Sequence, residues 1–364
     1  MTIRKLTRRE FLKSASVAGL AAAGPIILLR TAHAQTAWKP ERPIQVVIQF
    51  AAGGGTDVVL RTLLKQMEGS IGQRINVTNM PGALGSIATK HVMAQLADGS
   101  TWLGLGGFLD YPRIRGIDDA IAWKDFQLYQ VASSLASWAT HPSSPFKTFQ
   151  DVIDFAKNNP GKLRVSSDGV GGLWHEAIAR VAAKAGFEFT NVPYDGGAPA
   201  TVAALQREVD IAGSGLHEQI QFVRAGQLRH LATFTPAPVK VDDKLVLESV
   251  TKYVPGVAAS APFGGDYCLG LRRETPRHIL QAVSAAISAA VASAPFTKML
   301  EDRFIVANVV TGEAMDKKAA RLEVERAALF QELKLAKKTA QELGLPSPEG
   351  FDKWWPPKDY KPAL

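Results

Sequence analysis

The feature that most constrains the fold of this chain occurs twice: an apolar strand leads into a glycine-rich turn, and a helix follows. In the first copy, residues 44–50 have the composition of a strand, and glycines occupy positions 53–55. Apolar residues then recur at helical spacing over 59–67, and Thr56 or Asp57 is expected to cap this helix.

The second copy has a strand at 163–167, a turn at 168–172 and a helix that ends before Gly186. Strands and helices continue to alternate after it. The expected elements are a helix over 199–205, a strand over 209–213, a helix over 216–225 and a strand over 228–234. Such alternation predicts an α/β fold with largely parallel sheets. The tail from Leu345 onward, rich in proline and aromatic residues, is expected to lie extended on the body without regular structure.

The first 34 residues have the three parts of an export signal. A basic stretch is followed by the apolar run Ala15 to Leu29, and Ala32-His33-Ala34 predicts cleavage after Ala34. The apolar run is shorter than the roughly 20 residues that cross a bilayer, which favours a cleaved signal over an anchor. Residues 7–13 resemble a twin-arginine signal, which predicts export to the periplasm by the twin-arginine translocase. An ordinary signal for the general secretion route would lead to the same compartment.

The length and composition of the mature chain exclude several classes of protein. Its 330 residues exceed the ~250–300 at which a single core stops growing, so two domains are expected. The first 34 residues carry six Lys/Arg and one Glu, and without them the formal net charge falls from +8 to +3. No long basic run remains, so no nucleic-acid partner is expected. Cys268 is the only cysteine, which excludes an intrachain disulfide and a CxxC metal or redox site.

The two glycine turns are candidate anion-binding sites. A helix N-terminus offers unpaired backbone N–H groups and about half a positive charge, so it binds an anion without a cationic side chain. Glycines let the backbone approach a ligand closely because they lack Cβ. The hydroxyls of Thr56, Ser166 and Ser167 are candidate donors beside the turns. The alternative is that the glycines only form tight turns, and their duplication favours a binding site.

The sequence contains no motif that indicates catalysis, nucleotide binding or metal coordination. Neither glycine turn continues as GxGxxG, and no GxxxxGK[ST] occurs. His175-Glu176 and His217-Glu218 lack the second histidine of HExxH, and no GxSxG elbow occurs. His175 is placed either to face a ligand or to serve the structure, and Asp57 either caps its helix or receives an amino or hydroxyl group. We expect no catalytic residue, no metal and no cofactor.

The glycine turns belong to a longer series of motifs whose order and spacing extend over about residues 42–343. The series comprises Phe50 to Asp57 with Arg61, Asn79 to Gly85, Asp98-Gly99, Ser166 to Gly171, Pro193 to Pro199, Val209-Asp210 and Ala225-Gly226. In these motifs the chain resembles the Bug/TctC family, the extracytoplasmic solute receptors of tripartite tricarboxylate transporters.

This resemblance implies a two-lobed periplasmic binding protein (Venus flytrap) fold of α/β type, with mixed, mainly parallel sheets. Lobe 1 would comprise residues 38–135 and 258–344, lobe 2 residues 136–257, and a C-terminal extension residues 345–364. Backbone amides and ordered waters would hold the carboxylate of the ligand. The candidate site residues are Gly54, Gly55, Thr56, Asp57, Gly85, Ser86, Gly171 and Gly172 by motif, Ser167 as a hydroxyl donor, and Tyr194 and Asp210 as further candidates.

The chain departs from the family pattern in three places. Gly172 stands where the family often has Ser or Thr, which removes a hydroxyl. Asp195 stands where lysine is common, so a ligand with an acidic group at its distal end is expected to bind less tightly. The twin-arginine signal is the third departure, because it is not the usual export route of the family.

Together these observations predict a periplasmic solute-binding receptor and not an enzyme. It would close over one small organic carboxylate and deliver it to the membrane subunits of a tripartite tricarboxylate-type transporter. Two alternatives remain open. The first is an exported hydrolase or lyase on the same fold, which a positioned nucleophile–base pair would indicate. The second is a receptor that reports its ligand to a sensor kinase.

Overall fold

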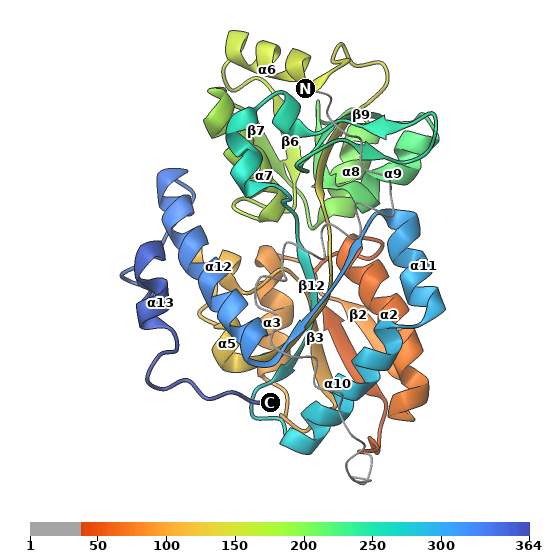
Figure 1. Ribbon diagram of the computed structural model, residues 1–364, viewed down its shortest axis with the longest axis vertical. Helices are drawn as coiled ribbons and strands as arrows, with labels where there is room; N and C mark the ends of the chain where they lie inside the picture. The colour runs from red at the N-terminus through yellow and green to blue at the C-terminus, as the bar shows by residue number, and fades with distance from the viewer. Residues whose placement is uncertain (1–37) are drawn as a thin grey trace.

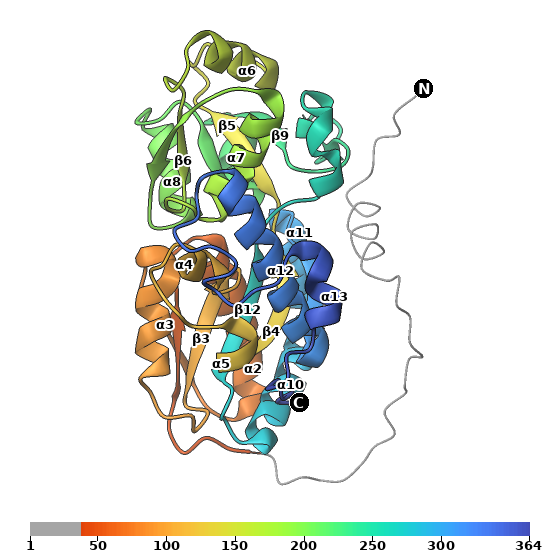
Figure 2. The ribbon, with the colours of Figure 1, turned by 90° about the vertical axis from the view of Figure 1, so that its left-hand side faces the viewer.

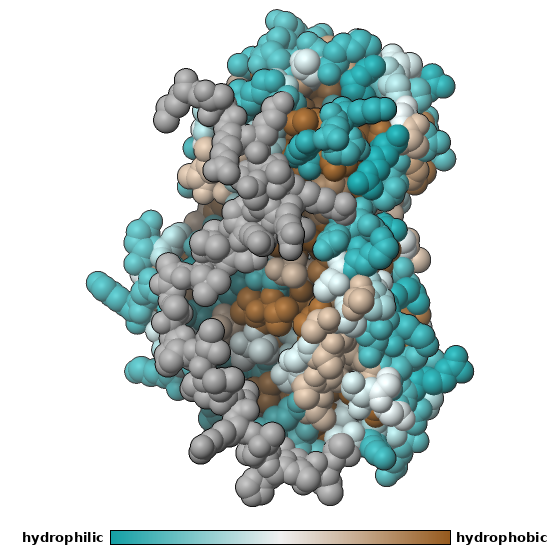
Figure 3. Space-filling view, turned by 45° about the vertical axis from the view of Figure 1, so that its right-hand side comes forward, coloured by the Kyte–Doolittle hydropathy of each residue, from teal (hydrophilic) through white to brown (hydrophobic). Residues whose placement is uncertain are grey.

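The computed structural model describes residues 38–364, so the expected signal segment, residues 1–34 with its cleavage site, lies outside the described residues. The described chain forms two α/β lobes, stacked one above the other in Figure 1. Trp38 and Leu364 both pack against the core of the larger lobe. On the face drawn in Figure 3, hydrophilic residues cover most of the outer surface, and a hydrophobic area lies at the waist between the lobes.

A six-stranded sheet forms the centre of the larger lobe, in the order β13-β4-β12-β3-β1-β2. Its strands are β1 (Ile44–Ile48), β2 (Ile75–Asn79), β3 (Thr101–Gly106), β4 (Phe126–Ser133), β12 (Asp266–Arg272) and β13 (Val306–Thr311). β1 pairs in parallel with β2 and β3. β12 runs antiparallel to β3 and β4, and β13 runs antiparallel to β4.

Helices cover both faces of this sheet because its strands are apolar on both sides. Val46 and Ile48 of β1 pack on one face, and Val47 between them packs on the other, as the alternation of a strand requires. The first face carries α2 (Gly55–Ile71), α10 (Arg277–Val291) and α11 (Ala294–Arg303). The second face carries α3 (Ser86–Met93), α5 (Ala122–Asp125) and α12 (Gly312–Glu332), with α4 (Asp110–Ile114) beside α12 at the end nearer the smaller lobe.

The smaller lobe contains short sheets and the helices that pack on them. Its strands are β5 (Ala136–Thr140), β6 (Arg164–Ser167), β7 (Thr190–Pro193), β8 (Ala212–Gly215), β9 (Arg229–Thr233), β10 (Val239–Lys240) and β11 (Val246–Leu247). Its helices are α6 (Phe149–Asn158), α7 (Leu173–Ala185), α8 (Gly197–Leu205) and α9 (Leu216–Arg224). β5 lies between β8 and β9 and is antiparallel to both, whereas β6 and β7 are parallel.

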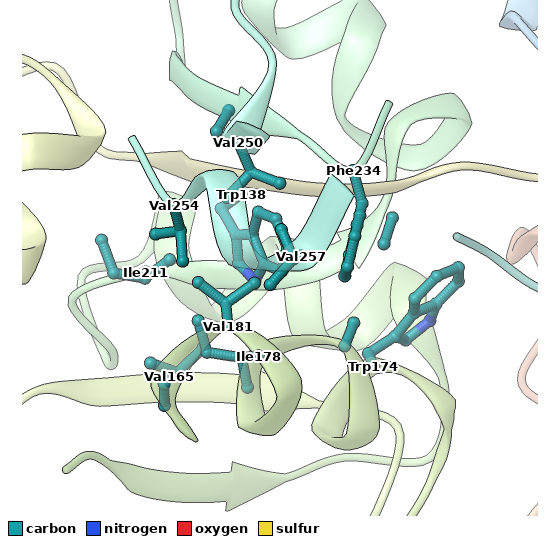
Figure 4. Close-up of a cluster of buried hydrophobic side chains, with 14 of the residues drawn as sticks. Trp138, Val165, Trp174, Ile178, Val181, Ile211, Phe234, Val250, Val254 and Val257 are labelled. Carbon is teal, nitrogen blue, oxygen red and sulfur yellow. The ribbon is translucent and has the colours of Figure 1, made fainter. Parts of the chain in front are cut away.

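The core of the smaller lobe lies between its strands and α7 (Figure 4). Trp138 of β5 and Val165 of β6 belong to one buried cluster with Val181 of α7. Each such side chain contributes about 1.5–3 kcal/mol when it is fully buried. This packing fixes α7 and therefore the glycine turn that precedes it. The labelled members of the cluster are Trp138, Val165, Trp174, Ile178, Val181, Ile211, Phe234, Val250, Val254 and Val257.

Two segments cross between the lobes and are hydrogen-bonded to each other. Ser134 follows β4, and Gly265 precedes β12. The Ser134 N–H donates to the Gly265 carbonyl (2.7 Å), and the Gly265 N–H donates to the Ser134 hydroxyl oxygen (2.9 Å). A Cβ on Gly264 would lie 2.1 Å from the Ser134 carbonyl oxygen, so this close approach of two backbones requires glycine. We call residues 134–135 and 263–265 the crossing pair.

Helix α12 begins on the larger lobe, and its C-terminal half reaches the smaller lobe (Figure 2). Phe330 belongs to the buried cluster formed with α7. Arg326 binds Asp110 of α4 (Nη1–Oδ2 2.7 Å) and Glu176 of α7 (Nε–Oε2 3.2 Å). The Tyr111 hydroxyl donates to the same Glu176 oxygen (2.6 Å). These four polar side chains are buried and form what we call the Arg326 cluster, which joins elements of both lobes.

The first glycine-turn helix begins earlier than the sequence predicted. α2 starts at Gly55 with Gly54 as its N-cap, so the expectation of Thr56 or Asp57 at the N-cap is wrong. Extended backbone at Gly54 (φ −73°, ψ 171°) allows the turn to enter the helix directly. Asp57 nevertheless caps the turn from inside the helix, because its carboxylate accepts a hydrogen bond from Gly53 N (3.0 Å).

The remaining elements agree with the sequence in kind and differ in detail. The strand expected over 209–213 is shifted to β8, because the amides of Asp210 and Ile211 bond instead to the Arg164 carbonyl. The sheets are mixed, as expected, but parallel pairing between named strands of the described chain occurs in β1–β2, β1–β3 and β6–β7, with isolated parallel bridges at Val165–Ile211 and Thr233–Ser249. β12, the strand that returns from the smaller lobe, enters the larger sheet antiparallel to β3 and β4.

The C-terminal tail contains regular structure, contrary to the expectation of an extended segment. Pro348–Gly350 forms a 3₁₀ turn, and α13 spans Phe351–Trp354. Trp355 then packs edge-on against Trp123 of the larger lobe, with ring centroids 5.6 Å apart. Aromatic burial against α5 and α12 gives this short helix a partner that the local sequence did not reveal.

Cys268 lies in β12 and is fully buried, and burial raises the pKa of its thiol well above the usual value. Within residues 38–364, no group of three His, Cys, Asp or Glu side chains is arranged to hold a metal ion. In the same range no single helix is long and apolar enough to cross a membrane, and the bent pair α10–α11 meets that test by length and composition only.

Candidate ligand-binding cleft

A cavity lies between the lobes, where four helices begin. The first residues of α2, α7 and α8 line it directly, and α9 contributes the side chain of Glu218. Ser134 and Gly265 of the crossing pair and Tyr267 of β12 also line it. The cavity is therefore bounded by both lobes and by the segments that connect them.

The carboxylate of Glu218 bridges the starts of two helices across the cleft. Its Oε1 accepts a hydrogen bond from Gly55 N at the start of α2 (3.2 Å). Its Oε2 accepts one from Gly215 N, the N-cap of its own helix α9 (2.9 Å). A Cβ on Gly197, the first residue of α8, would lie only 1.8 Å from Oε2. Glycine at 197 thus leaves the space that this carboxylate fills.

The other amides of the first glycine turn also have acceptors within the protein. Gly53 N donates to Asp57 Oδ2 (3.0 Å), and Gly54 N donates to the Ala51 carbonyl (3.3 Å). Together with the bond from Gly55 to Glu218, these contacts satisfy the three glycine amides of the turn. The protein itself supplies the acceptors that the sequence assigned to a ligand.

The second glycine turn has the same arrangement around Asp168. Its carboxylate accepts hydrogen bonds from Leu173 N (3.2 Å) and Trp174 N (2.8 Å) at the start of α7. Burial raises the pKa of Asp168 to about 7 despite these bonds, and the nearby Glu218 carboxylate adds to the rise. A Cβ on Gly172 would lie 2.6 Å from Asp168 Oδ1, which explains why a larger residue is missing there.

His175 completes the second turn from inside α7. Its Nδ1 accepts a hydrogen bond from Gly171 N (2.9 Å). Burial lowers the pKa of His175 to about 4, and the Arg115 guanidinium lowers it further. The imidazole is therefore neutral at neutral pH and can accept this bond. Its place in the turn is structural.

A wider mouth adjoins the cavity, and both are lined by Ala51 and Asp168. Tyr194 and Asp195 of the smaller lobe line the mouth together with the 81–84 loop of the larger lobe. The lobes touch at this place, since Ala51 N donates to the Asp195 carbonyl (3.1 Å). The mouth, like the cavity, is therefore bounded by both lobes.

Charged side chains are few and unevenly placed in the cleft. Among the described residues lining the cavity, Asp168 and Glu218 are the charged ones, and none is Lys, Arg or His. The described residues lining the mouth include one cation, Arg115, together with Asp168 and Asp195. The cavity is thus rich in acceptors, and a positive side chain, Arg115, lines its mouth.

The structure brings together only part of the predicted site. Gly54, Gly55 and Thr56 line the cavity, and Tyr194 lines the mouth. Gly171 and Gly172 shape the second turn behind Asp168. Ser167 belongs to the same turn, where its hydroxyl donates to the Gly169 carbonyl (3.1 Å).

Four other predicted site residues have internal partners and do not line the cavity or its mouth. Asp57 binds Arg61 (Oδ1–Nε 2.7 Å), and Asp210 accepts a hydrogen bond from Arg164 N (2.8 Å). Gly85 and Ser86 start α3; the Gly85 carbonyl accepts hydrogen bonds from Gln49 and Thr89, and the Ser86 hydroxyl donates to Asp118.

Sequence reasoning missed the two acids of the cavity. Asp168 was read as part of a glycine turn, and Glu218 was considered only as a fragment of a metal motif. A local signal for Glu218 existed, because a glutamate three residues after the N-cap is the usual position for a capping-box partner. Its contact with Gly55, 163 positions away in the chain, depends on the tertiary fold.

Comparison with known proteins places this cleft in a family. The model of the tripartite tricarboxylate transporter family receptor matches residues 59–333, well over half of the chain. The chain belongs to this receptor family. The Bug/TctC resemblance found in the sequence motifs is thereby confirmed. A UPF0065 protein encoded between tcbD and tcbE in Pseudomonas sp. strain P51 is 31% identical to the receptor over 273 residues, 72% of this chain and 77% of the relative.

Solved structures show that the receptor has the expected two-lobed periplasmic binding protein fold. The periplasmic binding protein BugD aligns with a TM-score of 0.74 at 23% identity, covering 82% of this chain and 100% of BugD. An R. palustris protein solved with adipate aligns with a TM-score of 0.69 at 22% identity, covering 85% of this chain and 99% of that protein. At these identities the likeness establishes the fold.

Proposed function

We propose that this receptor captures a small organic carboxylate in the periplasm, does not transform it, and delivers it to the membrane subunits of a tripartite tricarboxylate transporter. The observation that carries the proposal is the cavity between two lobes at which four helices begin. Family membership supports the transporter as the destination. The structural neighbour that contains adipate supports a carboxylate as the cargo.

Closure of the lobes is the step that the geometry explains best. Hydrogen bonds from Gly55 to Glu218 and from Ala51 to Asp195 cross the cleft, and the cavity lies between them. A ligand in the cavity is therefore enclosed by the same surfaces that hold the lobes together. Ligand binding and closure are coupled because the ligand adds contacts to both lobes. The membrane subunits would then recognise the closed, loaded form.

No observation favours the alternative of an exported hydrolase or lyase. The Ser134 hydroxyl lies against the crossing pair, where it donates to the Gly265 carbonyl (3.1 Å). His217 faces the Tyr267 hydroxyl (3.0 Å) and the Glu218 carboxylate (Nε2–Oε1 3.6 Å), with 2% of its side chain exposed. Both the Ser134 hydroxyl and the His217 imidazole thus have structural partners within the protein, which supports a binding protein.

Export by the twin-arginine translocase, with cleavage after Ala34, is part of the same proposal. It is supported by the basic, apolar and small-residue segments of positions 1–34 and by the periplasmic relatives of the fold. Transport of the folded protein fits a chain with one cysteine, since no disulfide has to form after export.

A thermal-shift screen of the mature protein from Gln35 tests the proposed function. Mono-, di- and tricarboxylates of two to eight carbons are compared with their methyl esters, which keep the carbon chain and remove the charge. Ligand at about 100 times its Kd adds about 2.7 kcal/mol of stability, a rise of several degrees in Tm. We expect some acids to raise Tm and their esters to have no effect. Unchanged Tm with every acid, for protein shown to be ligand-free by mass spectrometry, would overturn the proposal.

A further inference from the structure

The cavity presents hydrogen-bond acceptors where a carboxylate-binding cavity would present donors. The amides at the starts of α2 and α7 are already bonded to protein groups, among them Glu218 and Asp168. An ionised carboxylate has about four acceptor positions, and the structure gives each of these two acids two backbone donors. Acceptor positions therefore remain for a ligand, and a ligand group placed there must donate hydrogen bonds.

Glu218 is a fixed part of the cavity wall. It is tied to the N-cap of its own helix through Gly215 N, and 4% of its side chain is exposed. Gly197 leaves room for it, since a Cβ at that position would lie 1.8 Å from Oε2. A side chain held at both ends and fitted among glycines does not swing aside for an incoming anion. It sets the chemistry of the ligand.

The positive helix N-termini do not make the cavity a binding site for an anion. Each contributes about half a positive charge, so the four around the cavity offset the two carboxylates without leaving an excess. A third carboxylate in the cavity would meet like charges and amides that are already bonded. An ammonium group would donate hydrogen bonds to Glu218 and Asp168.

Aromatic rings in the cavity favour the same group. Phe50, Trp174 and Tyr267 line it, each from a different element of the fold. The face of an aromatic ring attracts an ammonium ion through its quadrupole, and the attraction grows when water is excluded. Acidic and aromatic side chains together form the usual environment of a bound amine.

The carboxylate of the ligand then belongs at the mouth. Arg115 is the cation among the described mouth residues, and its side chain lies along Gly171 beside the second turn. The mouth and the cavity share Ala51 and Asp168, so one elongated molecule can occupy both. Glu218 lines the cavity and Arg115 lines the mouth, so the two ends of such a molecule would meet opposite charges.

From these observations we infer that the receptor binds an amino carboxylate, with its amino group between Glu218 and Asp168 and its carboxylate facing Arg115. The inference rests on the proposed function and narrows it. Glu218 is the residue that discriminates between an amine and a second carboxylate at the inner end of the ligand. A diacid of the same length would place a negative charge beside Glu218 and Asp168, so it is expected to bind less tightly than the amino carboxylate.

Three compounds of five carbons each test the inference by calorimetry: 5-aminopentanoate, pentanoate and glutarate. They differ at one end, which is an ammonium, a methyl or a carboxylate. The set is repeated for chains of three to six carbons to match the length of the cleft. For the best length, we expect the amino acid to bind at least tenfold more tightly than the diacid. A diacid that binds as tightly as the amino acid, or more tightly, overturns the inference and leaves the proposed function intact.

The variants Glu218→Gln and Asp168→Asn test whether these two acids bind the amino group of the ligand. Each keeps the shape of the side chain and removes its charge. We expect each to weaken the amino acid at least tenfold more than it weakens pentanoate. Glu188→Gln is the matched control, because Glu188 is exposed on the same lobe. Circular dichroism and Tm show whether each variant is folded, and the two acids provide independent tests if one variant is not. Unchanged selectivity in a folded Glu218→Gln protein contradicts the inference.

The ligand set also separates this inference from the proposed function. If no acid of any kind binds, the proposed function fails and the inference fails with it. If acids bind without regard to the amino group, only the inference fails. Tighter glutarate binding by Glu218→Gln than by the wild type is a further expected result, because the substitution removes a like charge.

Discussion

Glu218 fits into the cavity wall because the residues that face it are glycines. Gly197 leaves the space that the Glu218 carboxylate fills. Gly172 does the same for Asp168. These two glycines therefore make room for acidic side chains, in addition to allowing tight turns.

The two glycine turns and the helix after each of them could be predicted from sequence, because each depends on a local motif. The acidic side chains that accept hydrogen bonds from these turns could not be predicted. Asp168 and Glu218 look like an ordinary turn residue and an ordinary capping residue when only their neighbours in sequence are considered. Their convergence on one cavity follows from lobe closure, which no local pattern encodes.

The raised pKa of Asp168 gives the binding of an amino carboxylate a pH dependence. Asp168, with a pKa of about 7, is mostly protonated at pH 6 and mostly ionised at pH 8. Across the cavity it faces Glu218, and beyond its own turn lie Arg115 and His175, whose pKa of about 4 keeps it neutral in this range. An ammonium group prefers the ionised form, so affinity falls as the pH falls through 7.

Calorimetry at pH 6, 7 and 8 measures this dependence. We expect the affinity for the amino acid to drop severalfold from pH 8 to pH 6, with release of a proton on binding at pH 7 and below. Asp168→Asn should remove both effects. Affinity that rises toward pH 6 would contradict this assignment, because a protonated Asp168 would then be the binding form.

At the scale of elements, the two halves of α12 pack against different lobes. Its N-terminal half packs on the larger sheet, and its C-terminal half carries the Arg326 cluster to the smaller lobe. Local sequence determines some elements, as in α6, which begins with a Thr148–Asp151 capping box. Local sequence did not predict α13, whose stability depends on contact with Trp123, far away in the chain.

Arg326→Met tests the role of α12. The substitution leaves Asp110 and Glu176 buried without their shared cation, although Arg180 still binds Glu176. Loss of one partner from a buried ion pair costs about 3–5 kcal/mol. We expect a decrease of that size in the free energy of unfolding, measured by urea titration.

Arg321→Met on the same helix is the matched control. Arg321 pairs with Asp352, and both side chains are more than one third exposed. An exposed pair contributes about 0–1 kcal/mol, so the control should lose no more than that. Equal losses in the two variants would show that the Arg326 cluster has no special role.

At the scale of the whole molecule, we propose that residues 38–135 with 258–344 move as one body and residues 136–257 as the other, with 345–364 attached to the first. The two-lobed architecture was predictable from the sequence, since alternating strands and helices over this length require two cores. The pairing of the two crossing segments was not, because it joins residues about 130 positions apart, as in the contact of Ser134 with Gly265.

Gly264→Ala tests the crossing pair. The added methyl group would lie 2.1 Å from the Ser134 carbonyl oxygen, so the two backbones must separate. Overpacking of this kind costs about 1–3 kcal/mol, which we expect as a lower free energy of unfolding. Gly69→Ala is the control, because Gly69 lies in α2 with nothing within 4 Å of the added Cβ. There the same substitution should stabilise by up to about 1 kcal/mol. A loss at Gly69 as large as that at Gly264 would contradict the assignment.

The position of Cys268 makes the motion of the lobes directly measurable. The chain has one thiol, and it lies in the core of the larger sheet, with 0% of the residue exposed. Alkylating dyes therefore have no native target on the folded surface. A cysteine introduced on each lobe can carry a donor–acceptor fluorophore pair without prior removal of the native residue. Single-molecule energy transfer between the two dyes would then report opening and closing in an otherwise unaltered protein.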